Sequence, residues 1–468
     1  MGETPTLQPI TTRQPESRPR SRLHDPINVR MAPLSTRPMR RLAPASVSGL
    51  FAPNMRSSYW LSRLVPLAVF AFPITVASVE NAGSGIGLLL LIAGLFFGRQ
   101  WDALDDKEKP VLVGFVVLLV VMALSLMNSS DLDTGVERLE RFVRIAAFVP
   151  IYLMLRRFDI FTGRAFVYGG AVAGPVLAFQ AWYQMDVLHE GFATGAYHKI
   201  IFGDMAMLAA VLALLGACYA VNSRLKQLAF VAGAAAAIYA SVLSGTRGAW
   251  ILLPILGLFL LWLYRRQLNR RIWAGVAAMV LLFGFAAANT DAVRSGLESG
   301  ATDLRTFMTA PAAETSWGIR LNLWRNSLLI LKDSPLLGTG QGDFQHDMVA
   351  MTKDGRSLNT YVADFSHAHS IYFHALATSG LLGFAALLIA LFYLPFRYFH
   401  RHWSPGGDPM VRFYSLGGMV SLIAFAVFGL SEGWLARNPF VVAYVMCTLV
   451  FMSGLANTLA KTQRQGHG

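Results

Sequence analysis

A cluster of histidines contains the residues of this sequence that are best suited to acid–base chemistry, in the stretch Ser366-His367-Ala368-His369-Ser370. An imidazole titrates near neutral pH, so His369 could take a proton from a hydroxyl group such as that of a sugar. A zinc site using His367, His369 and His374 is a second interpretation. Its spacing differs from the His-Glu-x-x-His pattern of zinc enzymes, and His369 and His374 would not share a helix face. A third interpretation is a hydrogen-bonded histidine with no catalytic role.

Arg247 is the second candidate, because it lies in Ser244-Gly245-Thr246-Arg247-Gly248 between two apolar segments. The flanking glycines would let backbone and ligand approach closely. A guanidinium is suited to bidentate binding of phosphate oxygens. The alternative is an anchor whose charge reaches out of the bilayer at its surface. The Gly-Thr-Arg-Gly pattern favours the phosphate-binding role.

Three arginines recur at every third position before another apolar segment, namely Arg138, Arg141 and Arg144. This spacing places them on roughly one face of a helix. A basic stripe that descends into a membrane suits an anionic lipid headgroup. The alternative is that the arginines pair with the acids beside them, which are Asp133, Glu137 and Glu140.

Lys199 and Asp204 begin a further apolar segment. A charged side chain within a membrane-spanning segment is unfavourable unless it is paired. We therefore expect Asp204 to be buried against a basic partner, in a structural role. Lys199 is expected to be exposed enough to meet a ligand.

The elements that must position these residues are membrane-spanning helices. Of the 468 residues, 54% are hydrophobic and only 14% are charged, whereas about a quarter are charged in soluble domains. A span needs about 20 mostly apolar residues. We predict an all-α polytopic membrane protein with about twelve transmembrane helices. The predicted spans are 60–79, 83–98, 109–127, 140–155, 164–186, 199–220, 224–243, 248–264, 271–289, 370–396, 412–430 and 438–459.

The distribution of the net charge of +13 predicts the orientation. Lysines and arginines gather in alternate turns, while the other turns hold little beyond Lys199, Arg247 and Arg437. The positive-inside rule then places both termini in the cytoplasm and these three residues outside. No soluble basic domain is present, so we expect no nucleic-acid partner. Cys218 and Cys447 fall within apolar spans and indicate no disulfide framework or metal site.

The chain is expected to divide into five parts. These are a disordered basic cytoplasmic tail (1–57), transmembrane helices 1–9 (58–289), a periplasmic loop domain with amphipathic helices (290–368), transmembrane helices 10–12 (369–460) and a short cytoplasmic tail (461–468). Met31 is a candidate alternative start. Within the loop domain, Trp317 to Leu331 has the pattern of an amphipathic helix that carries Arg320.

Three motifs, in this order along the chain, resemble the O-antigen ligase and polymerase superfamily. Ser244-Gly245-Thr246-Arg247 is similar to its Ser-x-Thr/Ser-Arg element. A second similarity is Arg320…Trp324…Pro335-Leu336-Leu337-Gly338-Thr339-Gly340…Phe344. The third runs from His369-Ser370-Ile371-Tyr372-Phe373 to Gly380-Leu381-Leu382-Gly383 and resembles the His-Asn-x-x-Leu…Gly-x-x-Gly signature. Ser370 departs from the usual asparagine, and Lys199 lies near a position where relatives often have arginine.

The resemblance implies a glycosyltransferase C-like fold and an active site at the periplasmic face of the bacterial inner membrane. The donor would be an O-antigen glycan on undecaprenyl pyrophosphate, and the acceptor a hydroxyl of lipid A–core oligosaccharide. His369 would be the general base, and transfer would invert the anomeric carbon without a metal or other cofactor. The pyrophosphate would be bound by Arg247, Lys199, Arg144, Arg141 and Arg320, and the supporting residues would be His367, Arg138 and Asp204.

Three other activities stay open at this point. An O-antigen polymerase or a protein O-oligosaccharyltransferase would use the same chemistry on another acceptor. Polymerases often have two sizeable external loops, so the single loop here favours a ligase. A transporter of lipid-linked glycans without catalysis would be expected to show internal repeats and spans broken at the midplane, and the sequence shows neither.

Overall fold

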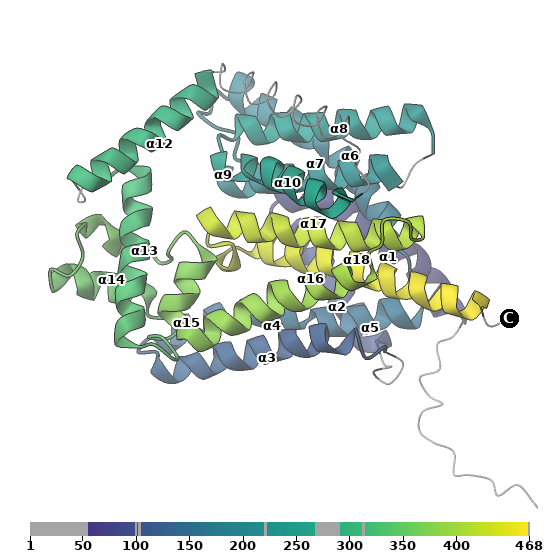
Figure 1. Ribbon diagram of the computed structural model, residues 1–468, viewed down its shortest axis with the longest axis horizontal. Helices are drawn as coiled ribbons and strands as arrows, with labels where there is room; N and C mark the ends of the chain where they lie inside the picture. The colour runs from purple at the N-terminus through teal and green to yellow at the C-terminus, as the bar shows by residue number, and fades with distance from the viewer. Residues whose placement is uncertain are drawn as a thin grey trace, which may run out of the picture. The chain divides into compact units, whose positions relative to one another are not determined.

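The computed structural model describes residues 55–98, 101, 104–219, 222–266, 291–310 and 314–466. The chain divides into two units, 1–52 and 53–468, and every described residue belongs to the second. All the regular structure in these ranges is helical (Figure 1), which confirms the predicted all-α class. The predicted tail 1–57 lies almost wholly outside the described residues, and the predicted span 271–289 lies wholly outside them.

The helices before residue 267 are α1 (Met55–Ser78), α2 (Ala82–Phe97), α3 (Lys109–Ser125), α4 (Leu132–Ala146), α5 (Phe148–Arg157), α6 (Gly163–Trp182), α7 (Lys199–Tyr219), α8 (Arg224–Leu243), α9 (Arg247–Trp250) and α10 (Leu252–Tyr264). Those after residue 290 are α12 (Asp291–Thr309), α13 (Ser316–Asp333), α14 (Phe344–Lys353), α15 (Ile371–Leu387), α16 (Leu394–His402), α17 (Pro409–Ser431) and α18 (Asn438–Gly466). A short turn of 3-10 helix, Trp434–Ala436, connects α17 to α18.

Nine helical segments among the described residues are long and apolar enough to cross a membrane. They are Tyr59–Ser78, Lys109–Asn128, Gly163–Val187, Lys199–Tyr219, Arg224–Leu243, Arg247–Tyr264, Ile371–His402, Pro409–Ser431 and Asn438–Gln465. A tenth apolar helix, Ala82–Phe97, is shorter. The chain is therefore a multi-pass membrane protein.

The structure differs from the prediction at 140–155, where one span was expected. Two helices, α4 and α5, meet there at Ala147. Pro150 has no N–H to donate to the carbonyl of Ala146, which explains the interruption. The Asp131 side chain accepts a hydrogen bond from the Thr134 N–H at 3.0 Å and caps α4. The arginine stripe therefore lies on an amphipathic helix that precedes a short apolar one.

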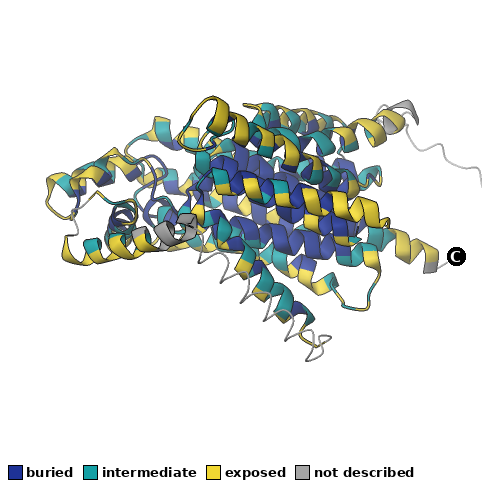
Figure 2. Ribbon diagram, turned by 90° about the horizontal axis from the view of Figure 1, so that it is seen from above, coloured by how far each residue is buried: buried dark blue, intermediate teal, exposed yellow. Residues whose placement is uncertain are grey.

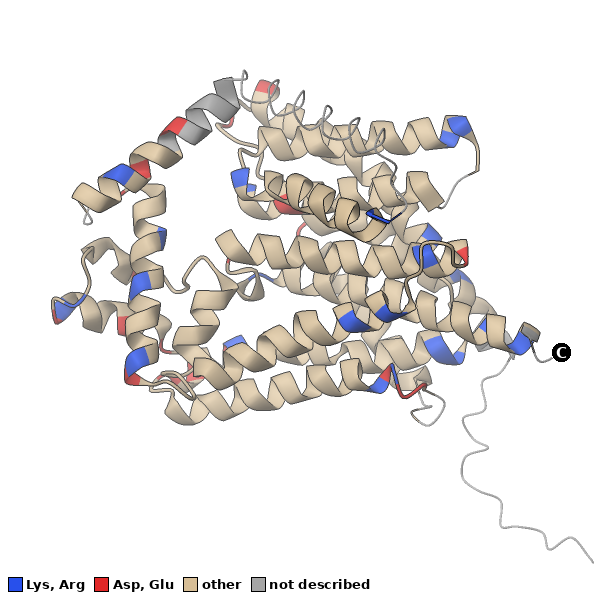
Figure 3. Cartoon of the chain, in the orientation of Figure 1, with Lys and Arg blue, Asp and Glu red and all other residues tan. Residues whose placement is uncertain are grey.

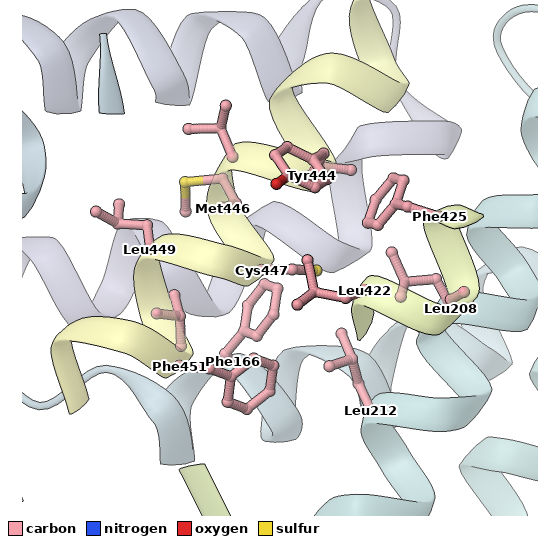
Figure 4. Packing of buried hydrophobic residues seen from close by; sticks show 14 of the residues in the cluster. Phe166, Leu208, Leu212, Leu422, Phe425, Tyr444, Met446, Cys447, Leu449 and Phe451 are labelled. Carbon is pink, nitrogen blue, oxygen red and sulfur yellow. The ribbon is translucent and has the colours of Figure 1, made fainter. Parts of the chain in front are cut away.

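The centre of the bundle is formed by α7, α17 and α18, whose residues are mostly buried (Figure 2). Figure 4 shows Phe166 of α6 beside Phe451 of α18, and the centroids of the two rings are 6.0 Å apart. Glycines allow this close packing, since a Cβ at Gly417 would meet the Phe451 ring. Small residues at helix contacts are typical of membrane bundles, because lipid tails give no hydrophobic drive for association.

The two ends of the bundle differ in charge. Lysines and arginines collect at the helix ends that lie near the C-terminus (Figure 3). The opposite end carries α12, α13 and α14 (Figure 1), which form the described part of the predicted loop domain. This end also carries the start of α15, so the histidine cluster lies beside the loop domain.

Candidate functional site

His369 occupies the last loop position but one before α15, where it has a left-handed backbone conformation with φ of 49°. This conformation costs about 1 kcal/mol or more for a residue other than glycine, and it persists only where neighbours enforce it. The Ser370 hydroxyl donates to the Gly429 carbonyl of α17 at 3.1 Å. The indole N–H of Trp324 on α13 donates to the Ala368 carbonyl at 3.0 Å. His369 is thus held between α13 and α17.

A buried glutamate faces His369. Oε2 of Glu432 lies 3.7 Å from Nδ1 of His369, and the Glu432 side chain is only 3% exposed. His367 is part of the same cluster: its Nδ1 accepts a hydrogen bond from the His369 backbone N–H at 3.2 Å. The centroids of the two imidazole rings are 4.3 Å apart. On the other side of the carboxylate, Nε of Arg437 lies 3.8 Å from Oε1.

The surroundings fix the charges of this cluster. Burial alone would raise the pKa of Glu432, but His369 and Arg437 outweigh it and hold that pKa below its ordinary value. Glu432 is therefore an ionised carboxylate at neutral pH. Burial, helped by the positive charges nearby, lowers the pKa of His367 to about 4. His367 is therefore neutral and can accept the hydrogen bond from His369.

Arg320 of α13 lies within electrostatic range of the same cluster. Its guanidinium Nη1 donates to the carbonyl of Ser316 at 3.2 Å and to the hydroxyl of Ser316 at 2.7 Å, while its buried Nε has no hydrogen-bond partner. Burial lowers the pKa of Arg320, and the negative charge of Glu432 opposes that shift. Arg320 and Glu432 thus lie within electrostatic range of each other, although 112 positions of sequence separate them.

The turn that carries Arg247 is fastened to the start of α7. The Thr246 hydroxyl donates to the Lys199 carbonyl at 2.8 Å, and Gly245 supplies the turn with a φ of 66°. Nζ of Lys199 lies 3.7 Å above the centroid of the Phe192 ring. A Cβ at Gly248 would meet the side chain of Ser431, the residue before Glu432. The Lys199–Arg247 pair therefore adjoins the segment that carries Glu432.

Asp204 is buried as predicted, with 1% exposure, but the prediction that it has a basic partner is wrong for the described residues. No lysine, arginine or histidine nitrogen in the described ranges lies within 4.0 Å of its carboxylate, and its Oδ2 has no hydrogen-bond partner. The charged residue that acts on Asp204 electrostatically is another acid, Glu432. The cation nearest in sequence, Lys199, lies more than one helical turn earlier and packs on Phe192 instead.

The three arginines of α4 separate into two kinds. Nη2 of Arg144 lies 2.7 Å from Oε1 of Glu140, and Nη2 of Arg141 lies 3.8 Å from Oε1 of Glu137. These two contacts match the acid-pairing interpretation. Arg138 differs, because its Nη1 lies 3.4 Å from Nε2 of His374 on α15.

The two glycine-containing motifs form one structural unit. Gly380 has φ 59° and ψ −162°, which interrupts α15 and leaves carbonyls and amides of the helix without partners. The loop after α13 satisfies them. The hydrogen bonds are Thr339 N to Ala377 O (3.1 Å), Gly340 N to Thr378 O (3.1 Å), Leu381 N to Pro335 O (2.9 Å) and Leu382 N to Leu336 O (3.1 Å). This interlock fixes the loop after α13, and so the end of α13, against α15.

The residues that could bind a metal ion in the structure differ from those suggested by the sequence. Metal-binding atoms of His367, His369 and Glu432 all lie within 4.8 Å of one another. His374, the third ligand of the sequence-based zinc interpretation, is absent from this group and contacts Arg138 instead. Two histidines and a carboxylate are a known zinc ligand set. Arg437, whose Nε lies 3.8 Å from Oε1 of the same carboxylate, disfavours a further cation there.

Glu432 and Arg437 are the residues of this cluster that were missing from the sequence-based set. The sequence did contain a feature that points to Glu432, because this acid directly follows the long apolar segment of α17. An acid this close to an apolar segment needs a polar or charged partner wherever it is buried. Their pairing with the histidines was not readable, since it depends on how α15 and α17 pack.

Comparison with known proteins supports the motif assignment. The family model described as O-Antigen ligase matches residues 232–388, which confirms the resemblance over this range. The matched segment includes Arg247, Arg320 and His369, whereas Lys199 and Glu432 lie outside it. An uncharacterized protein of Haemophilus influenzae is 21% identical over 400 residues, which cover 84% of this chain and 98% of the relative.

Proposed function

We propose that this protein, which carries an O-antigen ligase family domain at residues 232–388, is a membrane glycosyltransferase of the ligase type. It transfers an O-antigen glycan from undecaprenyl pyrophosphate to lipid A–core oligosaccharide. The observation that carries the proposal is the contact of Glu432 with His369 next to the turn that holds Lys199 and Arg247. Arg320 of α13 lies within electrostatic range of the same carboxylate.

In the proposed reaction, His369 is the general base. The acceptor hydroxyl oxygen attacks the anomeric carbon, and its proton passes to the His369 imidazole. The bond between the anomeric carbon and the phosphate oxygen breaks, and the electron pair leaves with undecaprenyl pyrophosphate. A single displacement inverts the configuration of that carbon. The ionised Glu432 carboxylate, 3.7 Å from Nδ1, stabilises the imidazolium that forms.

The cations bind the diphosphate as it leaves. Arg247, Lys199 and Arg320 supply positive charge that a divalent metal supplies in other phosphate-transferring sites, so the proposed mechanism needs no metal. Arg141 and Arg144 hold exposed glutamates whose side chains are 72% and 59% accessible. Exposed pairs of this kind contribute only about 0–1 kcal/mol. Phosphate oxygens can therefore displace both glutamates, and Arg144 is the one of the two arginines that we assign to the donor diphosphate.

The orientation is part of the proposal. The lysine- and arginine-rich helix ends near the C-terminus face the cytoplasm by the positive-inside rule (Figure 3). The end with α12–α14, His369 and Arg247 then faces the periplasm, where both lipid-linked substrates would be presented. The membrane is the bacterial inner membrane.

The test uses the purified full chain with a defined undecaprenyl-pyrophosphate glycan and lipid A–core acceptor. Wild type should transfer glycan equally with and without chelator, whereas His369→Ala should lose at least about 100-fold in kcat, the usual contribution of a general base. Full activity of His369→Ala refutes the base assignment. Loss of wild-type activity in chelator refutes the metal-free mechanism and favours the site at His367, His369 and Glu432.

A deletion strain distinguishes the acceptor classes. Bare core together with accumulated long glycan chains indicates a ligase. Core capped with single repeats indicates a polymerase, and loss of glycan from proteins indicates an oligosaccharyltransferase. Donor lipid that changes leaflet in vesicles without any transfer indicates a transporter.

A further inference from the structure

A small cavity lies between α4, α15 and the turn after α17, beside the histidine cluster. Its volume is about 30 Å³, and its polar lining includes Arg138, Arg141, Gln341, His367 and His374. None of Lys199, Arg247, Arg320 and Arg144, the cations assigned to the donor diphosphate, lines it. The cavity, which His367 lines, is therefore separate from the cations assigned to the donor diphosphate.

The lining of this cavity is positively charged. It includes two arginines and no aspartate or glutamate. No carboxylate oxygen of the described residues lies within 4.0 Å of Arg138, whose Nη1 contacts Nε2 of His374 at 3.4 Å. Nδ1 of His374 is buried and has no hydrogen-bond partner. Arg141 has only a distant contact, 3.8 Å, with a glutamate that is 72% exposed. Partly buried cations without full compensation favour an anionic ligand.

The arginines are also held in place before any ligand arrives. Asp343, in the loop before α14, accepts hydrogen bonds from the Ser129 hydroxyl at 3.0 Å and from the backbone N–H groups of Ser130 at 2.7 Å and Asp131 at 3.0 Å. Asp131 in turn caps α4. The start of α4 is thus fastened to the loop domain, and His374 fixes the direction of Arg138 from α15. Such preorganisation is typical of a binding site.

We propose that this cavity binds a phosphate group carried by the acceptor saccharide, with Arg138 and Arg141 as its ligands. The inference rests on the proposed glycosyl transfer. A volume of about 30 Å³ admits about two water-sized groups, so phosphate oxygens enter while a sugar ring stays outside. In a single displacement the acceptor and the leaving diphosphate lie on opposite sides of the anomeric carbon. The acceptor therefore needs anchoring groups separate from those of the donor.

Kinetics of Arg138→Gln and Arg141→Gln test this assignment. Each variant is assayed with a core acceptor that carries its phosphates and with the same acceptor after phosphatase treatment. We expect the acceptor KM of each variant to rise about 10- to 100-fold for the phosphorylated form, the range for one lost charge-assisted hydrogen bond. The KM for the donor and the rate with the dephosphorylated acceptor should stay within about twofold of wild type. Arg464→Gln is the matched control, since Arg464 pairs with Asp159 at 3.1 Å at the other end of the bundle.

Two kinetic outcomes overturn the proposal. An equal loss with both acceptors assigns Arg138 and Arg141 a structural role. A rise in donor KM alone assigns the cavity to the donor diphosphate. Arg138→Lys separates misfolding from lost binding, because it keeps the charge and should retain part of the preference for the phosphorylated acceptor.

Direct binding keeps this test independent of the proposed reaction. Thermal unfolding of the purified chain is measured with phosphorylated core saccharide, with dephosphorylated saccharide and with inorganic phosphate. The phosphorylated saccharide should stabilise wild type and Arg464→Gln, but not Arg138→Gln. Equal stabilisation by free phosphate overturns the assignment to the acceptor. If wild type transfers no glycan at all, the proposed function fails, and this measurement alone decides what the cavity binds.

Discussion

Oε2 of Glu432 lies 3.7 Å from Nδ1 of His369, and the two side chains come from the end of α17 and the start of α15. A carboxylate on one side of an imidazole favours a proton on the nitrogen that faces it. In the proposed reaction, the opposite nitrogen, Nε2, is the one that accepts the proton of the acceptor hydroxyl. Triads of serine, histidine and aspartate use a carboxylate in the same way, to orient the imidazole and to stabilise its charged form.

Glu432→Gln should therefore reduce kcat about 10- to 100-fold and leave the KM for the donor nearly unchanged, because the side chain acts through His369. Glu432→Asp, which keeps the charge, should restore part of kcat. A glutamine that retains full activity would show that the carboxylate only fills space. Asp159→Asn, which removes an exposed carboxylate paired with Arg464, provides the matched control.

Arg247→Ala should weaken donor binding about 10- to 100-fold, since one charge-assisted contact to the diphosphate is lost. Binding of a fluorescent undecaprenyl pyrophosphate to the purified variant measures this directly. Arg247→Lys should recover only part of the affinity, because an ammonium cannot bind two oxygens side by side. Arg265→Gln serves as the control, as Arg265 donates to the Trp262 carbonyl at 2.7 Å at the far end of the same apolar segment. Unchanged affinity and turnover in Arg247→Ala would mean that Arg247 is an interface anchor.

The helices were predictable wherever one apolar block forms one element. The predicted span 224–243 coincides with α8 (Arg224–Leu243), and 412–430 lies within α17 (Pro409–Ser431). The interruption at Ala147 was missed, because average hydropathy over a window does not register one proline. The kink at Gly380 was not predicted either. The carbonyls of Ala377 and Thr378 that it frees accept hydrogen bonds from a loop some 40 residues earlier, and sequence spacing does not show that pairing.

The site was predictable as far as single residues allow. Sequence context singled out His369 and Arg247, because each departs from the apolar pattern around it. Arg320 was named as a site residue only through the family resemblance. Sequence spacing could not show that Glu432 meets His369. Nor could it show that no cation of the described residues lies within 4.0 Å of Asp204. The contact of Glu432 with His369 depends on helix packing across more than 60 positions of sequence. The surroundings of Asp204 depend on which side chains pack around it.

Gly380→Ala should destabilise the protein and reduce activity together. The residue has a positive φ, and a Cβ there would lie 2.5 Å from the Leu336 carbonyl and 2.7 Å from the Gly338 nitrogen. Displacing that loop moves α13, and with it Arg320, away from His369. Gly257→Ala is the matched change, because nothing lies within 4 Å of its Cβ and alanine favours a helix by about 0.5–1 kcal/mol. Thermal unfolding and transfer rates of both variants check this, and equal effects would contradict the proposed interlock.

Asp347 predicts a pH dependence of stability in the loop domain. Burial raises its pKa to about 6, even though the Thr339 hydroxyl donates to Oδ2 at 2.6 Å. The folded state therefore binds a proton at Asp347 that the unfolded state, with a pKa near 3.8, has already released. The stability from this group is fully present below about pH 3.8 and is lost as pH rises to about 6.

His367, with its pKa lowered to about 4, acts in the opposite direction, so the test must compare variants rather than wild type alone. Asp347→Asn should lack this loss and be more stable than wild type at pH 7, as measured by unfolding temperature across the pH range. Asp354→Asn alters an exposed acid just after α14, the helix that carries Asp347, and its unfolding temperature should follow that of wild type across the pH range. Parallel curves for wild type and Asp347→Asn would contradict the raised pKa.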